Sequence, residues 1–125
     1  MKFLLDTNVI IWFFEGSPRL EQVKEFFFYS DSELYISSVS FWEIAIKIKI
    51  GKLPITISSI KSLVNEYNFR ELPMTSDHIQ AYLDLPNLHK DPFDHMLLAQ
   101  AISCPMRFIT GDSLLAEYSS LVMVV

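Results

Sequence analysis

The sequence contains one cysteine, Cys104, among its 125 residues. A single cysteine excludes an internal disulfide and a cysteine-based zinc site. Apolar runs long enough to cross a membrane are also missing. The N-terminal apolar run is short and ends at Asp6, and no cleavage-site pattern follows, so we do not expect a signal peptide. These absences predict a cytoplasmic protein with no membrane partner.

Positive charge is scarce as well. Ten Lys and Arg residues stand against fifteen Asp and Glu residues, for a net charge of -5. This balance argues against a broad electrostatic footprint on nucleic acid. It leaves open an enzyme that touches RNA locally and holds cations at its active site.

Hydrophobic residues make up 50% of the chain, which excludes a disordered protein. The length fits one domain, residues 1–125. Short apolar segments alternate with longer periodic ones. The expected strands are Lys2–Leu5, Glu33–Ser37, Phe69–Leu72, Arg107–Thr110 and Leu121–Val125. The expected helices are Val9–Phe14, Pro18–Tyr29, Ser38 or Ser40 to Ile50, Ser58–Tyr67, Ser76–Leu83, Asp91 to about Ser103, and Ser113–Glu117. This alternation predicts an α/β fold whose parallel sheet is covered on both faces.

Four acidic residues lie where an expected strand passes into a helix: Asp6, Glu43, Asp94 and Asp112. Asp6 and Asp112 directly follow strands, which places both at the carboxyl edge of a parallel sheet, where such sheets bind ligands. Carboxylate oxygens are the ligands that Mg²⁺ and Mn²⁺ prefer. Each acid alone also has a simpler explanation as a helix cap or a first-turn residue.

Glu43 and Asp94 are harder to explain as solvated surface residues. Glu43 lies within the apolar run 41–46, and Asp94 lies between Phe93 and an apolar run that begins at Met96. A buried charge is costly unless it is paired or binds a metal. We therefore predict that the four acids converge on one metal site.

The chain resembles PIN-domain ribonucleases, in particular the VapC-type toxins of bacterial toxin–antitoxin modules. The resemblance rests on segments spread over nearly the whole length. They are Phe3–Val9, Ser37–Lys47, Gly51–Leu53, Asp91–Ala101 and Ile109–Asp112.

The resemblance implies a three-layer α/β/α sandwich with a small parallel sheet, and the family's acidic positions fall on Asp6, Glu43, Asp94 and Asp112. It implies an endoribonuclease in which Mg²⁺ or Mn²⁺ activates a water molecule to hydrolyse RNA. Asp6 and Asp94 are then the expected direct ligands, and the other two acids complete the cluster. A second copy of the chain and a cognate antitoxin are the implied partners. His95 departs from the pattern, because the toxins often have Arg there.

Other functions remain open at this stage. One is a catalytically silent PIN-like binding module. Another is a different magnesium-dependent phosphate-handling domain, such as a phosphatase or a receiver domain. The phosphatase pattern needs Asp at position 8, which is Asn8, and a receiver needs Lys at the end of its last strand, which the final segment Val122–Val125 lacks.

Several residues have two interpretations. Lys47, four residues after Glu43, forms either a helix-surface ion pair or part of a basic strip for phosphate. Thr7, Asn8 and Ser38 either orient the site or make local turns. The three histidines lack metal-ligand spacing, and we expect them in the core or on the surface. The aromatic runs Trp12–Phe14 and Phe26–Tyr29 exceed what one helix face buries, and they suggest a partner surface.

Overall fold

The computed structural model describes the chain from residue 1 to residue 125 except residues 28–30 and 88–90. Phe28, Tyr29 and His89, which the sequence singled out, therefore lie outside the described residues. No helix in the described parts is long and apolar enough to span a membrane.

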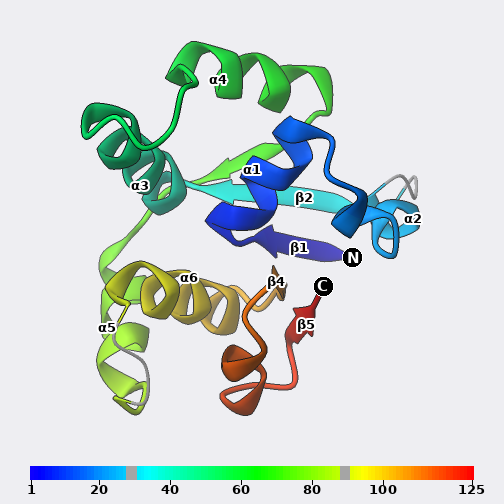
Figure 1. Ribbon diagram of the computed structural model, residues 1–125. Helices are drawn as coiled ribbons and strands as arrows, with labels where there is room; N and C mark the ends of the chain where they lie inside the picture. Colours follow the sequence, from blue (N-terminus) through cyan, green and yellow to red (C-terminus); the bar gives the residue numbers. More distant parts are fainter. Residues whose placement is uncertain (28–30, 88–90) are drawn as a thin grey trace.

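Five parallel strands form one sheet in the order β3-β2-β1-β4-β5. Their bounds are β1 Lys2–Leu5, β2 Glu33–Ser37, β3 Arg70–Leu72, β4 Arg107–Thr110 and β5 Val122–Val124. The chain builds β1, β2 and β3 toward one edge and then returns to place β4 on the other side of β1. The first strand is therefore the centre of the sheet, as Figure 1 shows.

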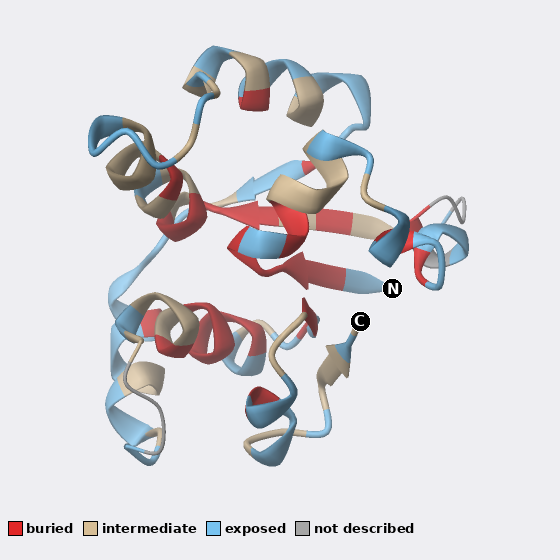
Figure 2. Ribbon diagram, viewed as in Figure 1, coloured by how far each residue is buried: buried red, intermediate tan, exposed pale blue. Residues whose placement is uncertain are grey.

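Alternating side chains of the central strands supply two separate cores. Phe3 and Leu5 belong to the core on one face of the sheet, whereas Leu4 belongs to the core on the other. Ile109 and Phe108 of β4 divide between the two faces in the same way. All five side chains are buried, and most of β1 and β4 is therefore red in Figure 2.

Helices cover both faces, so the predicted three-layer α/β/α sandwich is confirmed. One layer contains α1 (Thr7–Glu15), α2 (Lys24–Phe27), α3 (Ser38–Lys49) and α4 (Ile57–Glu66), which pack against the Phe3 side of the sheet. In the other layer, α6 (Pro92–Ser103) packs against the Leu4 side through Leu97, Leu98 and Ala101, and α5 (Ser76–Asp84) packs against α6. Figure 1 shows the two layers above and below the sheet.

The continuous helix expected over Pro18–Tyr29 is wrong in its described part. A 3-10 turn, η1, spans Pro18–Leu20, and the short helix α2 begins only at Lys24. Leu20, Val23 and Phe27 have the spacing of one helix face, which explains the prediction. All three are buried in the core next to α1, but a turn followed by a short helix is enough to place them there.

The aromatic runs are used within the molecule. The Phe13 ring lies 4.8 Å from the Tyr67 ring and 5.3 Å from the Phe69 ring, centroid to centroid. Phe27 is buried beside it, and Trp12 is half-buried. Trp12, Phe13 and Phe27 therefore pack within the molecule and are not the exposed partner surface that the sequence suggested.

The core beneath α6 yields a stability prediction. We expect Leu98→Ala to lower the free energy of unfolding by about 2–5 kcal/mol, because Leu98 is fully buried and its loss leaves a cavity. Leu114→Ala is the matched control, since Leu114 is 58% exposed and its truncation changes stability little. Urea denaturation of both variants and the wild type measures the difference, and equal losses would contradict the packing described here.

Candidate active site

Asp6 and Asp112 come together because β1 and β4 are neighbours. Leu5 pairs with Ile109, and the Asp6 backbone N–H donates to the Ile109 carbonyl at 2.9 Å. Both acids follow the carboxyl ends of their strands. This is also where the strand order reverses direction, the position at which open parallel sheets bind ligands.

Asp6 is 4% exposed, and both of its oxygens are used. Oδ1 accepts from the Thr7 backbone N–H at 2.7 Å, which caps α1. Oδ2 accepts from the Thr110 hydroxyl at 2.6 Å. Burial raises the pKa of Asp6 to about 6, with Glu43 and Asp91 adding to the rise, even though the two hydrogen bonds oppose it. Asp6 therefore caps α1, as the simpler explanation from the sequence expected, and the same carboxylate also has a raised pKa.

Glu43 belongs to the second turn of α3, and Ser37 is the cap of that helix, so Glu43 is neither a cap nor a first-turn residue. Oε2 lies 3.4 Å from the Lys47 ammonium, so the helix-surface ion pair is present. Oε1 is buried and, alone among the buried side-chain oxygens and nitrogens of the described residues, has no hydrogen-bond partner. A buried carboxylate oxygen without a donor is costly unless a cation or a ligand satisfies it.

Asp94 lies in the first turn of α6, and Asp91 is the cap, accepting from the Phe93 N–H at 2.9 Å. The pKa of Asp94 is raised to about 8. Burial is the largest cause, and the negative charges of Asp6, Asp91, Glu43 and Asp112 raise it further. Asp94 is therefore the residue on which the repulsion among the acids is concentrated.

Three of the four predicted acids line one cleft of about 370 Å³. The cleft is lined by Asp6, Asn8, Trp12, Arg19, Asp94, Gly111, Asp112 and Ser113. Glu43 is outside this lining, yet its charge raises the pKa of both Asp6 and Asp94. Within the described residues, no three Asp, Glu, His or Cys side chains lie close enough to hold a metal ion together. The acids are thus coupled through their charges without forming a closed ligand set.

These residues fit a divalent cation. The donors are hard carboxylate oxygens, and Glu43 Oε1 lacks a partner. Burial raises the pKa of Asp94, and the neighbouring carboxylates raise it further. A cation offsets both the missing hydrogen bond and the repulsion. The acids are Asp6, Glu43, Asp94 and Asp112, and their roles as metal ligands remain a prediction.

The other residues singled out from the sequence are either structural or, in the case of Asn8, part of the cleft lining. His95 is buried, with Nε2 3.4 Å from the Tyr118 hydroxyl, and His78 is buried with Nδ1 accepting from the Thr75 N–H. Both are core histidines. The Ser38 hydroxyl accepts from the Met74 N–H, and the Thr7 hydroxyl donates to Ser40, so both make structural bonds. Asn8 is exposed and lines the cleft.

Sequence analysis missed Thr110, Trp12 and Arg19. Thr110 holds Asp6, and its hydroxyl also accepts from the Asp112 N–H at 3.1 Å, so it links two of the acids. Its position just before Gly111 and Asp112 was a usable signal, because strand ends at such an edge supply site residues. No sequence pattern indicated that Arg19 belongs to the site, because only the turn after α1 brings it to the cleft.

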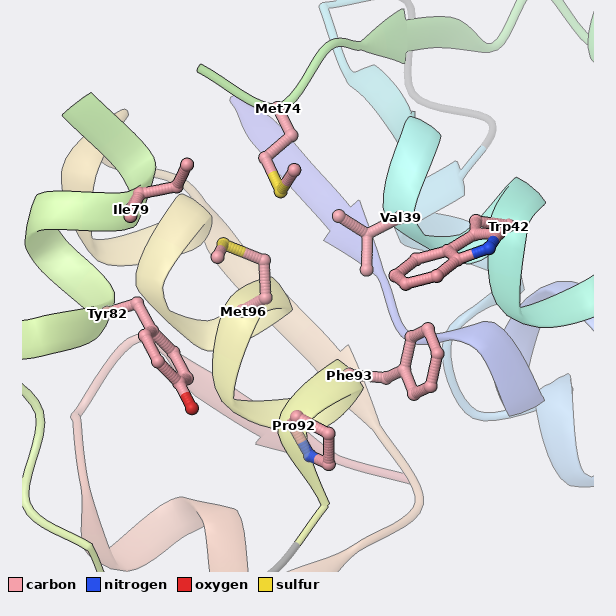
Figure 3. Close-up of a pocket in the computed structure, with 8 residues that line it drawn as sticks. All are labelled: Val39, Trp42, Met74, Ile79, Tyr82, Pro92, Phe93 and Met96. Carbon is pink, nitrogen blue, oxygen red and sulfur yellow. The ribbon is translucent and has the colours of Figure 1, made fainter. Parts of the chain in front are cut away.

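A second depression, of about 330 Å³, has an apolar lining (Figure 3). It is lined by Val39, Trp42, Met74, Ile79, Tyr82, Pro92, Phe93 and Met96. The Trp42 ring from α3 lies 5.2 Å from the Phe93 ring of α6, and Trp42 remains 61% exposed. This apolar groove is the exposed hydrophobic surface that the sequence had placed elsewhere.

Comparison with known proteins gives one family. The PIN-domain family model matches residues 3–121, and no protein of curated function matches significantly.

Two solved structures share the fold. The first is a chain of VapBC2 from Rickettsia felis, in a structure with a DNA fragment from the VapBC2 promoter. It superposes with a TM-score of 0.77 at 14% sequence identity, and the match covers 100% of this chain and 98% of that chain. A chain of a toxin-antitoxin complex from Klebsiella pneumoniae superposes with a TM-score of 0.69 at 19% identity, covering 97% and 95%.

The raised pKa of Asp94 predicts a pH-dependent gain from neutralising it. In EDTA, the folded state keeps a proton on Asp94 that the unfolded chain releases near pH 4, so stability falls as the pH rises toward 8. Asn cannot ionise. We therefore expect Asp94→Asn to melt higher than wild type, with a gain that grows from about pH 4 to pH 8 and reaches roughly 3–5 °C after allowance for solvent screening.

Asp77→Asn is the matched control, because Asp77 is an exposed first-turn acid of α5. Its melting temperature should follow the wild type at every pH. A gain for Asp94→Asn that is equally large at pH 4 and pH 8 would show that charge repulsion is not its cause.

Proposed function

Since this chain belongs to the PIN-domain family, we propose that it is a metal-dependent endoribonuclease and the toxin of a VapBC-type toxin–antitoxin pair. The observation that carries the proposal is the coupling among the acids. Asp94 has a pKa raised to about 8 by burial and by four neighbouring carboxylates, at a sheet edge suited to ligands. Strongly perturbed groups in a cleft are typical of active sites.

Asp6 and Asp94 are the residues we assign to direct binding of Mg²⁺ or Mn²⁺, with Glu43 and Asp112 completing the set. When bound, such an ion lowers the pKa of a coordinated water and offsets the charge that develops on the phosphoryl oxygens. The Thr7 N–H and the Thr110 hydroxyl hold the Asp6 carboxylate in one orientation. Asp112 is held through its own cap and through Thr110. Hydrolysis by water needs no side-chain nucleophile from this cleft.

The partner of this toxin is proposed to be a small antitoxin protein. Both structural neighbours come from toxin–antitoxin assemblies, and they match this chain over nearly its full length. We place the pair in the cytoplasm, where the RNA is. A protein partner that covers the acidic cleft would silence the nuclease without changing its fold.

A second copy of the chain is the occupant we propose for the apolar groove. The groove is a hollow, and the same surface carries protruding apolar side chains, since Trp42 and Ile79 remain 61% and 43% exposed. A two-fold dimer needs a surface that is complementary to itself, and a hollow beside protruding side chains meets this need.

A catalytically silent binding module is the alternative function. It is disfavoured because all four acids are present and their charges are coupled. The two functions differ in one measurement: a silent module binds RNA without cutting it in Mg²⁺ or Mn²⁺.

We expect cleavage of RNA in Mg²⁺ or Mn²⁺ that EDTA abolishes. Asp6→Asn and Asp94→Asn should each lower the rate by more than about a hundredfold, the upper end for losing a group that only supports a metal ligand. Lys47→Ala should cost less, since it removes only an ion-pair partner of Glu43. Gel analysis of total cellular RNA measures the rates, with Asp77→Asn as a control that keeps full activity. Undiminished cleavage in EDTA would rule out the metal mechanism.

We also expect self-association through the groove. Ile79→Glu should convert a dimer into a monomer at roughly tens of micromolar protein. Ile50→Glu should not, although Ile50 is 59% exposed, because it lies at the C-cap of α3 and does not line the groove. Light scattering after gel filtration gives the mass of each variant. A monomeric wild type, or equal effects of the two variants, would remove the groove as the dimer surface.

A further inference from the structure

Arg19 is a cation in the lining of a cleft that is otherwise dominated by acids. It lies in η1, outside the strand ends that carry Asp6 and Asp112, and it lines the same 370 Å³ cleft as both. In a chain with a net charge of -5, a guanidinium beside three carboxylates needs an explanation.

The position of Arg19 is set by Trp12 and by the turn between them. The guanidinium carbon lies 4.0 Å from the centroid of the Trp12 ring, a cation–π contact. Gly16, in the left-handed conformation, ends α1, and the Ser17 N–H donates to the Trp12 carbonyl at 2.9 Å. The Ser17 hydroxyl then accepts from the Arg19 N–H. The chain therefore reverses onto its own tryptophan and places the cation over the ring.

Trp12 is itself held in place by the catalytic edge of the sheet. A Cβ atom added at Gly111 would overlap the tip of the indole ring, so the ring lies directly against the backbone between Thr110 and Asp112. Glycine at position 111 is thus explained by this close approach. Trp12 joins the position of Arg19 to the position of the acids.

Arg19 makes no ion pair with the acidic side chains of the cleft. Among the described residues, it forms no ion pair with an Asp or Glu side chain, although three carboxylates share the cleft. One guanidinium nitrogen donates to an oxygen of Val125, at 3.5 Å. A residue that served only to neutralise the acids would be expected at ion-pair distance from one of them. The remaining N–H groups are therefore available to a ligand of the cleft.

We propose that Arg19, held on Trp12, is a substrate-binding residue that contacts an RNA phosphate next to the acidic site. The proposal rests on the proposed ribonuclease function and adds to it the residue that attracts the polyanion. The guanidinium has two parallel N–H donors that match phosphate oxygens, and stacking on an indole fixes their plane before the substrate arrives. The acids repel RNA, so a fixed cation in the lining of the cleft favours the approach of the backbone, in addition to any metal ion that the acids bind.

The test compares Arg19→Gln and Arg19→Lys with Arg107→Gln, whose arginine is exposed at the opposite end of β4. All three variants lie outside the acidic set. Binding of a random-sequence single-stranded RNA pool is measured in EDTA, where no cleavage is expected, over a series of salt concentrations. KM and kcat are then measured in Mn²⁺, and melting temperatures report on folding.

We expect Arg19→Gln to weaken RNA binding about tenfold, the size of one charge-assisted hydrogen bond, and to reduce the salt slope by roughly 0.7. KM should rise and kcat should change little. Arg19→Lys should recover only part of the loss, because an ammonium keeps the charge but has no planar fork. Arg107→Gln should bind like the wild type.

Two outcomes overturn the proposal in different ways. If the wild type cleaves RNA and Arg19→Gln matches Arg107→Gln in binding and KM, Arg19 does not contact the substrate, and the ribonuclease function stands. A lowered melting temperature with unchanged binding leads to the same conclusion, since it assigns Arg19 a structural role. If the wild type neither binds nor cleaves RNA, the proposed function fails and the assignment of Arg19 fails with it.

Discussion

The hydrogen bond from the Thr110 hydroxyl to Asp6 Oδ2 joins the two halves of the molecule. It connects residues 104 positions apart and lies where β1 and β4 end side by side. Asp6 also caps α1, and Thr110 also accepts from the Asp112 N–H. This one bond therefore links α1, the ends of β1 and β4, and the acids Asp6 and Asp112. The positions of Asp6 and Asp112 in the cleft depend on it.

Folding gathers carboxylates here against their own repulsion. The pKa of Asp94 rises to about 8 and that of Asp6 to about 6, and Glu43 keeps an oxygen without a donor. Two hydrophobic cores, one on each face of the sheet, supply the stability that offsets this cost. Strain of this kind is typical of sites that serve binding more than stability.

Most of the fold was predictable because strands and helices in this chain differ in both length and pattern. Buried runs such as Lys2–Leu5 have no amphipathic period, and the order of segments implied a parallel sheet. Asp6 and Asp112 could be placed because strand ends define an edge. Glu43 and Asp94 were indicated by their apolar neighbours and by the resemblance to PIN-domain ribonucleases. Arg19 could not be found, because its place depends on a turn and on contact with Trp12, and neither leaves a local pattern.

The strand order also governs when the cleft comes into existence. The central strand β1 is made first, yet its second neighbour, β4, lies near the end of the chain, and Thr110 and Asp112 are made together with it. Contacts of such long range are slow to form, because the intervening loop must close before they add stability. During synthesis, a nascent chain therefore carries Asp6 and Glu43 without the groups that complete their surroundings. A protein built in this order acquires its acidic cleft only after β4 and Asp112 have left the ribosome, so shorter nascent chains lack it.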